Sequence, residues 1–103
     1  MANQDGRDTV LFRADVPAKR PNITAVFPCI PADDSGHLMT CYAHLGQHSG
    51  CSLQWYHTTR PAKPEEYADL KAELEAKPYE YRLDVRQRIT SDMHEVRRSE
   101  ARR

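Results

Sequence analysis

The chain has 103 residues, of which 29% are charged, and its fifteen basic and fifteen acidic residues cancel. This length allows one domain with one hydrophobic core, and it excludes a catalytic cleft between two lobes. The balanced charge excludes a global field that would draw the protein to nucleic acid or to an anionic membrane. The sequence has no apolar run of bilayer-spanning length, and residues 1–7 are polar, so we expect a cytoplasmic protein without membrane contact.

The first third of the chain predicts extended structure. Residues 1–8 are polar and are expected to form a flexible N-terminus, and the apolar run at residues 10–12 begins a first strand. Residues 23–27 form a second strand, which the two prolines that follow should end. Asp, Asp, Ser and Gly at residues 33–36 then supply a turn.

Residues 38–44 and 53–57 are rich in aromatic, β-branched and sulfur-containing side chains, and they flank a loop that contains glycine. This pattern predicts an antiparallel hairpin, with the stretch from Cys41 to Cys51 at its turn. That stretch is the most informative part of the sequence, because two thiols, two imidazoles, an amide and two glycines occur within it.

One amphipathic helix follows. Pro64 suits the first helical position, the acids after it suit the positive end of the helix dipole, and Pro78 ends the pattern. The apolar stripe of this helix consists of Tyr67, Leu70 and Leu74. Residues 79–89 then alternate apolar and charged side chains with a period of two, which predicts a half-buried strand.

These elements give the order ββββαβ, an α+β fold with a mainly antiparallel sheet of four to five strands and one amphipathic helix. We expect residues 9–90 to form the single domain and residues 91–103 to form a charged C-terminal tail that is solvated or frayed. One helix covers only one face of such a sheet. The uncovered face, with residues such as Val26, Met39 and Tyr56, suits a homodimer contact.

Cys41, His44, His48 and Cys51 are residue types that bind zinc. Their spacing departs from that of structural zinc fingers, in which ligand pairs are about a dozen residues apart, and Cys41 and His44 would point to opposite faces of one strand. The alternative is that Cys41 is a small buried apolar residue and the histidines form hydrogen bonds within the loop. The sequence therefore predicts no cofactor, with a structural zinc ion as the alternative. Three cysteines are too few for a disulfide scaffold and fit a reducing compartment, whereas a bridge from Cys41 to Cys51 fits an exported protein.

The same loop also predicts a recognition site. Glycine lets the backbone approach a ligand closely, while amide and imidazole groups supply directional hydrogen bonds. The alternative is a tight turn with positive φ at Gly46 and Gly50 and with solvated polar side chains. The candidate binding-loop residues are Tyr42, His44, Gly46, Gln47 and His48.

Charged residues are unevenly distributed near the end of the chain. From Arg82 onward there are seven arginines against four acids. This excess predicts, as a further alternative, a nucleic-acid-binding surface with Arg86, Arg88, Arg97 and Arg98 as candidate contacts. The sequence contains no pattern of paired carboxylates, Ser-His-Asp residues or a phosphate-binding loop, so we predict no catalytic residue and favour a non-enzymatic binding protein.

Three segments resemble a group of small uncharacterised proteins encoded by bacteriophages, prophages and related mobile elements. They are Ile-Thr-Ala-Val-Phe-Pro from Ile23, Thr-Cys-Tyr-Ala-His-Leu-Gly-Gln-His-Ser from Thr40, and Thr-Arg-Pro-Ala-Lys-Pro-Glu-Glu-Tyr-Ala-Asp-Leu from Thr59. Lys63 stands where that pattern has threonine as the helix cap. The resemblance implies an accessory protein in the cytoplasm of the host cell that binds a host protein or a small ligand, including a role against host defence.

Overall fold

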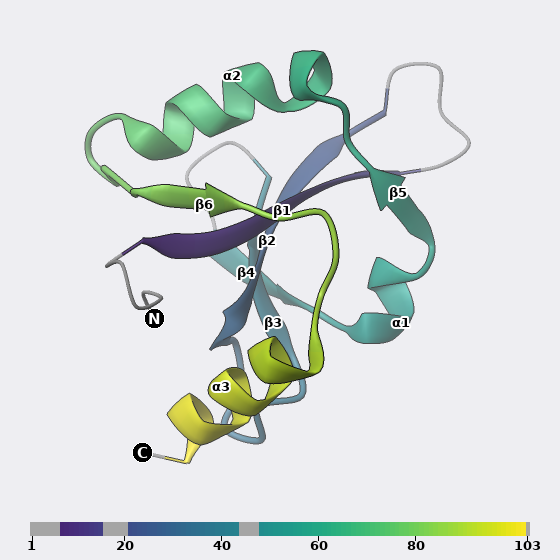
Figure 1. Ribbon diagram of the computed structural model, residues 1–103, viewed down its shortest axis with the longest axis vertical. Coiled ribbons are helices and arrows are strands. Elements are labelled where there is room, and N and C mark those ends of the chain that lie inside the picture. Colours follow the sequence, from purple (N-terminus) through teal and green to yellow (C-terminus); the bar gives the residue numbers. More distant parts are fainter. Residues whose placement is uncertain (1–6, 16–20, 44–47, 103) are drawn as a thin grey trace.

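The computed structural model describes residues 7–15, 21–43 and 48–102, with only the backbone of His48. Within these ranges six strands form one mostly antiparallel sheet, namely β1 (Asp8–Asp15), β2 (Ile23–Pro31), β3 (Met39–Tyr42), β4 (His48–Cys51), β5 (Thr59–Pro61) and β6 (Leu83–Val85). The helices are α1 (Leu53–Tyr56), α2 (Pro64–Glu75) and α3 (Ser91–Ala101). The predicted α+β fold with a mainly antiparallel sheet is confirmed (Figure 1). None of the helices in the described ranges is long and apolar enough to cross a membrane.

Strand β1 is an interior strand of the sheet and has partners on both sides. The strands follow the order β4-β3-β2-β1-β5, and each neighbouring pair is antiparallel. The second edge of β1 is shared, because its last residues pair with β5 whereas its first residues pair in parallel with β6. Alternation along β1 places Phe12 and Ala14 on one face and Leu11 and Arg13 on the other. Each of these faces has its own core.

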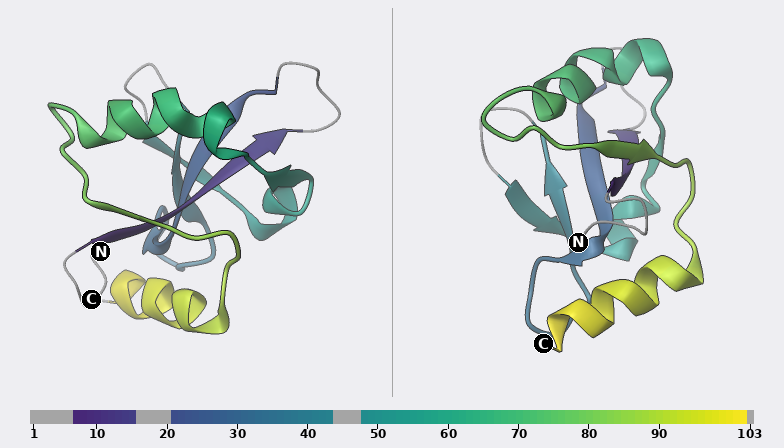
Figure 2. Two further views of the ribbon diagram at one scale, coloured as in Figure 1. Left: turned by 45° about the horizontal axis from the view of Figure 1, so that its top comes forward. Right: turned by 60° about the vertical axis from the view of Figure 1, so that its left-hand side comes forward.

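Helix α2 lies across the first face of the sheet (Figure 2). Its buried Leu70 and Leu74 pack on a core that includes Phe12 and Tyr42. Tyr67 of α2 stacks on Phe12, with the ring centroids 4.3 Å apart. The stripe predicted from the sequence is therefore the face that α2 turns to the sheet.

Glu66 compensates for the poor cap residue at the start of α2. Lys63 occupies the N-cap position, and its backbone N–H donates to Glu66 Oε1 at 2.8 Å. Arg60 of β5 donates to both carboxylate oxygens of Glu66, at 2.8 Å each. The Arg60 hydrogen bonds are the largest cause that lowers the pKa of Glu66 to about 2. This arrangement is the glutamate half of a capping box, strengthened by a neighbouring strand.

A smaller core covers the second face. It comprises Leu11, Val26, Met39, Cys41, Cys51 and Tyr56, with partly buried Leu53, Trp55 and Ile89 packed against it. The prediction that Val26, Met39 and Tyr56 share a face is confirmed. Arg13 lies beside this core, with its guanidinium carbon 4.1 Å from the centre of the Tyr56 ring. Helix α1 thus covers part of the second face of the sheet, which the sequence predicted to be uncovered.

A third helix, α3, forms where the sequence predicted a solvated or frayed tail. The Thr90 hydroxyl caps its start by accepting a hydrogen bond from the backbone N–H of Met93. The helix packs against β2 and lies at the opposite end of the molecule from α2 in both views of Figure 2. The tail prediction is therefore wrong for residues 91–101.

Buried Arg97 explains why this charged segment is ordered. The residue is 1% exposed. Its Nε donates to the carbonyl oxygen of Gly36 at 2.7 Å, and its Nη1 donates to that of Pro28 at 2.8 Å. Its Nη2 lies 2.7 Å from Nδ1 of His94. A buried guanidinium needs acceptors for its N–H groups, and these partners fix α3 on β2 and on the turn that precedes β3.

Residues 53–57 do not form the predicted arm of the hairpin. They begin helix α1, because Ser52 Oγ accepts a hydrogen bond from the backbone N–H of Trp55 at 3.1 Å and thereby caps a helical turn. The second strand of the hairpin is β4, which ends at Cys51. The Cys41 to Cys51 stretch therefore includes parts of both strands rather than forming a turn alone.

The predicted strand at residues 79–89 pairs with the sheet only as β6. Glu80 has φ of 51°, which interrupts an extended backbone. Tyr79 and Tyr81 pack on the first core, and their rings stack with centroids 6.2 Å apart. Their alternation with charged residues therefore reflects alternate burial against the core.

Strand β2 continues past Pro28 to Pro31, beyond its predicted end. Its pairing with β3 shifts register between Phe27 and Pro31. Because proline has no backbone N–H, a central strand accommodates it at such an irregularity. The pairing with β3 is therefore irregular at the prolines, but the strand continues.

Candidate functional site

An open hollow lies on the second face of the sheet, beside β3 and β4. Its volume is about 450 Å³. We call it the edge hollow, and the residues that give it its chemistry are Thr24, Cys41, Ser49, Cys51, Ser52 and Trp55. None of the described residues that line it is an acid, a lysine or an arginine, although 29% of the chain is charged. The edge hollow is therefore an uncharged site with hydroxyl, thiol and indole groups.

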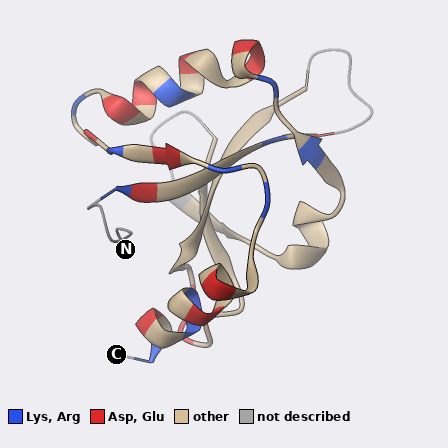
Figure 3. Cartoon of the chain, in the orientation of Figure 1, with Lys and Arg blue, Asp and Glu red and all other residues tan. Residues whose placement is uncertain are grey.

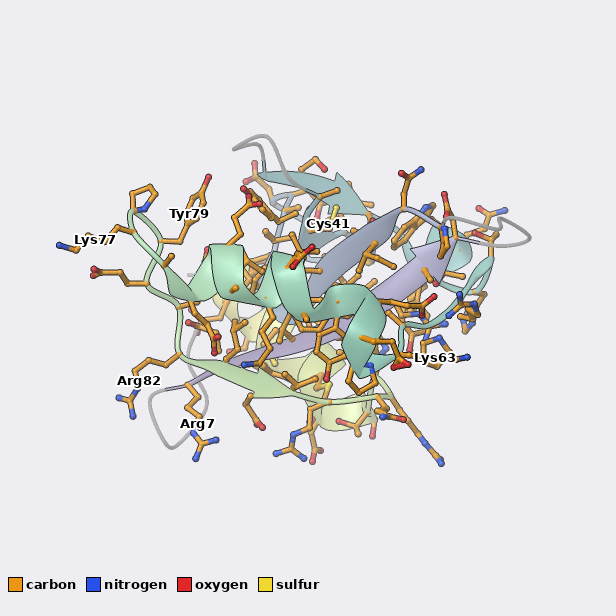
Figure 4. All side chains as sticks on the ribbon, turned by 90° about the horizontal axis from the view of Figure 1, so that it is seen from above. Arg7, Cys41, Lys63, Lys77, Tyr79 and Arg82 are labelled. Atoms are coloured by element: carbon orange, nitrogen blue, oxygen red, sulfur yellow. The ribbon has the colours of Figure 1, made fainter. Side chains whose placement is uncertain are left out.

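The strand register brings Cys41 and Cys51 together. Cys41 pairs with Ser49, and Cys51 is two residues further along β4, so the thiols are diagonal neighbours on one face. Both cysteines are free thiols and are buried in the second core. Figure 4 labels Cys41 on the strands beyond α2, well separated from Arg7 and Arg82.

Hydrogen bonds converge on the sulfur of Cys41. It lies 3.2 Å from Ser49 Oγ, and the Cys51 thiol donates to it. The Cys51 hydrogen bond is the largest cause that lowers the pKa of Cys41 to about 6. The same hydrogen bond and burial raise the pKa of Cys51. Cys41 is therefore the more acidic thiol of the pair.

Trp55 forms one wall of the edge hollow. Ser52, which also lines the hollow, caps α1 and so fixes the turn that carries Trp55. The indole packs in part against the second core and leaves the rest of its surface toward the hollow. Tryptophan combines a large apolar surface with one N–H donor, which suits it to hold an uncharged ligand.

The two sides of the sheet differ in how their edges are protected. Strand β4 ends the sheet on one side, and its sequence, His-Ser-Gly-Cys, has no lysine, arginine, acid or proline. On the other side, β5 contains Arg60 and Pro61, and Arg60 is bound to Glu66 of α2. Charged side chains and proline are common devices that stop an edge strand from pairing with another chain. Strand β4 is thus the edge that is suited to accept a further strand.

Tyr42 is not part of an exposed recognition loop. It is 1% exposed and lies on the first face, where its hydroxyl donates to the carboxylate of Glu73 in α2. Its ring also packs edge-on against Tyr79. The prediction for Tyr42 is wrong, because the register of β3 turns its side chain beneath α2. The other predicted binding-loop residues lie outside the described residues: His44, Gly46, Gln47 and the side chain of His48.

The structure brings together two of the four predicted zinc ligands. Cys41 and Cys51 share one face, whereas the side chains of His44 and His48 lie outside the described residues. Among the side chains that the structure describes, no group of three or more His, Cys, Asp or Glu residues is placed to hold a metal ion. A tetrahedral zinc ion needs two ligands besides the thiols, so the zinc site stays a prediction.

The arginines predicted to contact nucleic acid have different environments. Arg97 is buried and bound to backbone carbonyl groups, so its assignment as a nucleic-acid contact is wrong. Arg86 is exposed and forms an ion pair with Asp84 at 3.0 Å. Arg88 and Arg98 are exposed. Figure 3 shows basic and acidic residues interspersed along α3, which gives the helix no uniformly basic face.

Sequence reasoning missed the hydroxyl groups of the edge hollow. Ser49 lies two residues before Cys51, so the period of two along a strand would have placed both on one face. Ser52 precedes an apolar residue in a position typical of a helix cap, and that signal would have replaced the predicted strand by α1. Thr24 joins them from β2 through tertiary structure alone.

Comparisons of the chain with protein-family models, with curated proteins and with solved structures found no match.

Proposed function

We propose that this protein is a small binding protein that takes an extended, uncharged segment of a partner protein along β4. The segment adds a strand to the sheet and places side chains in the edge hollow. In this mode of recognition, backbone hydrogen bonds supply affinity and pockets for alternate side chains supply specificity. The observation that carries the proposal is the position of an unprotected edge strand directly beside an uncharged hollow.

The lining of the edge hollow defines the chemistry of the segment. Trp55 offers an apolar surface, and the hydroxyl groups of Ser49 and Thr24 offer hydrogen bonds. A charged side chain placed there would lose its hydration without meeting an opposite charge, which is unfavourable. The preferred segment therefore carries apolar or small polar side chains at alternate positions.

The resemblance to phage-encoded and prophage-encoded accessory proteins favours a host protein as the partner. The resemblance implies a protein that acts by binding and blocking a host assembly, and such binding needs no catalytic residue. A strand added to β4 requires only backbone groups and the hollow beside them. The proposal therefore suits a chain whose sequence predicts no catalytic residue.

Selection from a displayed library of short random peptides tests the proposal. We expect enrichment of uncharged peptides with apolar residues at alternate positions. Binding of a selected peptide should slow hydrogen exchange at those amides of β4 that point away from β3, which are alternate residues of the strand, because an added strand covers its free edge. Slowed exchange elsewhere, with these amides unchanged, contradicts the proposal.

Two variants locate the binding surface. Trp55→Ala removes the wall of the hollow, and Ser49→Lys places a charge in it, so each should weaken peptide binding about tenfold or more. Ser99→Lys is the matched control, since Ser99 is exposed on α3 and should leave binding unchanged. If Ser49→Lys binds as well as the control, the hollow is not the site. A concentration-dependent dimer that Ser49→Lys abolishes would assign the edge to a second copy and overturn the proposed partner class.

A further inference from the structure

Cys41 and Cys51 both line the edge hollow, and the register of β3 with β4 makes them diagonal neighbours on one face of the sheet. The proposed pairing of a further strand with β4 makes no use of these thiols. Ser49 Oγ is a further hydrogen-bond partner of Cys41, at 3.2 Å. Thiol–disulfide exchange needs an attacking thiol, access for a disulfide and a second thiol nearby, and two neighbouring thiols that line an open hollow supply these.

Cys29 shows that burial alone does not explain the arrangement. It is 8% exposed, against 7% for Cys41 and 7% for Cys51, so exposure does not separate the three residues. Cys29 is absent from the lining of the edge hollow, and its hydrogen-bond partner is Thr9 rather than a second thiol. The pair differs from Cys29 in its access to the hollow and in its neighbouring sulfur.

We infer that Cys41 and Cys51 form a thiol–disulfide exchange site that reacts with a low-molecular-weight disulfide. The Cys41 thiolate attacks one sulfur of that disulfide, forms a mixed disulfide and releases one thiolate. The released thiolate takes the proton of the Cys51 thiol. The Cys51 sulfur then attacks the sulfur of Cys41 and displaces the second thiolate. That thiolate takes up the proton that the Cys41 thiol had lost to solvent. The pair is oxidised by two electrons to a cross-strand disulfide, and the small disulfide is reduced to two thiols.

The position of β4 makes this reaction sterically feasible. Diagonal neighbours on adjacent strands are farther apart than the Cβ atoms of a disulfide, so one strand must shift for the bond to form. Strand β4 has four residues, ends the sheet and pairs only with β3 among the described strands. It can move toward Cys41 without breaking the pairing of β1 with β2, because β4 pairs with neither of these strands.

Incubation of the reduced protein with oxidised glutathione, followed by intact mass measurement without reductant, tests the inference. We expect a product lighter than the reduced chain by two hydrogen atoms. No lysine or arginine lies between Arg20 and Arg60, so trypsin leaves all three cysteines on one peptide. Cyanogen bromide, which cuts after Met39, separates Cys29 from Cys41, and chymotrypsin, which cuts after Tyr42, separates Cys41 from Cys51. The linked peptides should be those that contain Cys41 and Cys51. Linkage through Cys29, or no oxidation at glutathione ratios that oxidise a reference dithiol, overturns the inference.

Single substitutions distinguish the roles of the two sulfurs. Cys51→Ser should stop the reaction at a glutathione adduct on Cys41, whereas Cys41→Ser should slow adduct formation about tenfold or more. Cys29→Ser is the matched control and should give the wild-type disulfide at the wild-type rate. Equal rates in all three variants contradict the inference, as does a zinc ion retained by the purified chain that protects both thiols. If a variant fails to fold, the peptide map of the oxidised wild-type protein still shows which cysteines are linked. This map does not depend on whether β4 binds a partner.

Discussion

Arg97 Nη1 donates a hydrogen bond of 2.8 Å to the carbonyl oxygen of Pro28, and this bond joins α3 to β2 across 69 positions of the chain. Pro28 lies in the stretch where the pairing of β2 with β3 shifts register. The guanidinium therefore reaches a buried carbonyl at the irregular point of the sheet, and the neighbouring bond to Gly36 ties the turn to the same side chain.

The substitution Arg97→Ala should lower the free energy of unfolding by about 2–4 kcal/mol, because it leaves buried carbonyl groups without their donor. Urea denaturation followed by circular dichroism measures the change. Arg98→Ala is the matched control, since Arg98 is exposed on the same helix, and its effect should stay within about 0.5 kcal/mol. Equal losses in the two variants would show that Arg97 acts through charge rather than through its buried contacts.

His94 should make the attachment of α3 sensitive to pH. Burial is the largest cause that lowers the pKa of His94 below its ordinary value of 6.5, and repulsion from Arg97 and Arg98 adds to it. The unfolded chain therefore binds the proton more tightly than the folded protein. The contribution of neutral His94 is complete above pH 6.5 and should be lost as the pH falls toward the lower pKa of the folded state.

Urea denaturation between pH 7.5 and 5 measures the effect of His94, with His94→Gln as the comparison. Glutamine keeps an acceptor for Arg97 but does not titrate in this range. The wild-type protein should lose more stability than His94→Gln as the pH falls. Parallel curves for the two proteins would mean that the titration of another group dominates.

Gly36 should tolerate no side chain. It has φ of +78°, and a Cβ added there would lie 3.0 Å from the Cα of Arg98 and 3.1 Å from the Cβ of Ala101. Gly36→Ala should therefore cost about 2–3 kcal/mol, since backbone strain and a backbone contact add. Gly50→Ala is the matched control. Its added Cβ would meet the side chains of Ala32 and Leu38 at 3.1 and 3.3 Å, so a loss of about 1 kcal/mol or less is expected from thermal denaturation.

Glu66 should make the start of α2 sensitive to strong acid. Its folded-state pKa is about 2, below the ordinary value of 4.5, because Arg60 and the backbone N–H of Lys63 bind the charged form. Its contribution is therefore present above pH 4.5 and lost as the pH falls toward 2. Glu66→Gln should flatten the loss of stability over this range, whereas Glu65→Gln, at an exposed neighbouring position, should not. Identical acid titrations of the two variants would argue against the Glu66 contacts.

Elements whose structure depends on residues close together in the sequence were predictable, namely helix α2 and the turn at residues 33–36. The stripe of α2 repeats at helical spacing, and the turn at residues 33–36 contains an aspartate whose side chain accepts from the N–H groups of Gly36 and Leu38. Helix α3 was not predictable in the same way. Its order depends on a hydrogen bond between Arg97 and a carbonyl group far away in the sequence, and the local pattern of charged residues gives no sign of it.

The candidate site was predictable in part. The sequence singled out the stretch that contains Cys41 and Cys51, and the structure places both thiols in the edge hollow. The register of β3 against β4 decides which residues accompany them, and a shift of one residue would exchange Ser49 for Gly50 on that face. The sequence predicts Tyr42 in an exposed loop because it does not show that α2 covers this face of the sheet. It predicts Trp55 in a strand by composition, whereas the cap formed by Ser52 begins a helix there.

Two strands, β5 and β6, share one edge of β1, and this arrangement should slow folding. Strand β1 precedes both β5 and β6, and it cannot complete its pairing until segments far along the chain have returned to it. Such long loops must close before their contacts stabilise them, which slows folding relative to a sheet made of successive hairpins. During that interval a hairpin of β1 and β2 exposes the edge of β1 that β5 and β6 later cover, and at high concentration two such intermediates can pair with each other. Refolding yield should therefore fall as protein concentration rises, even though the finished fold buries that edge.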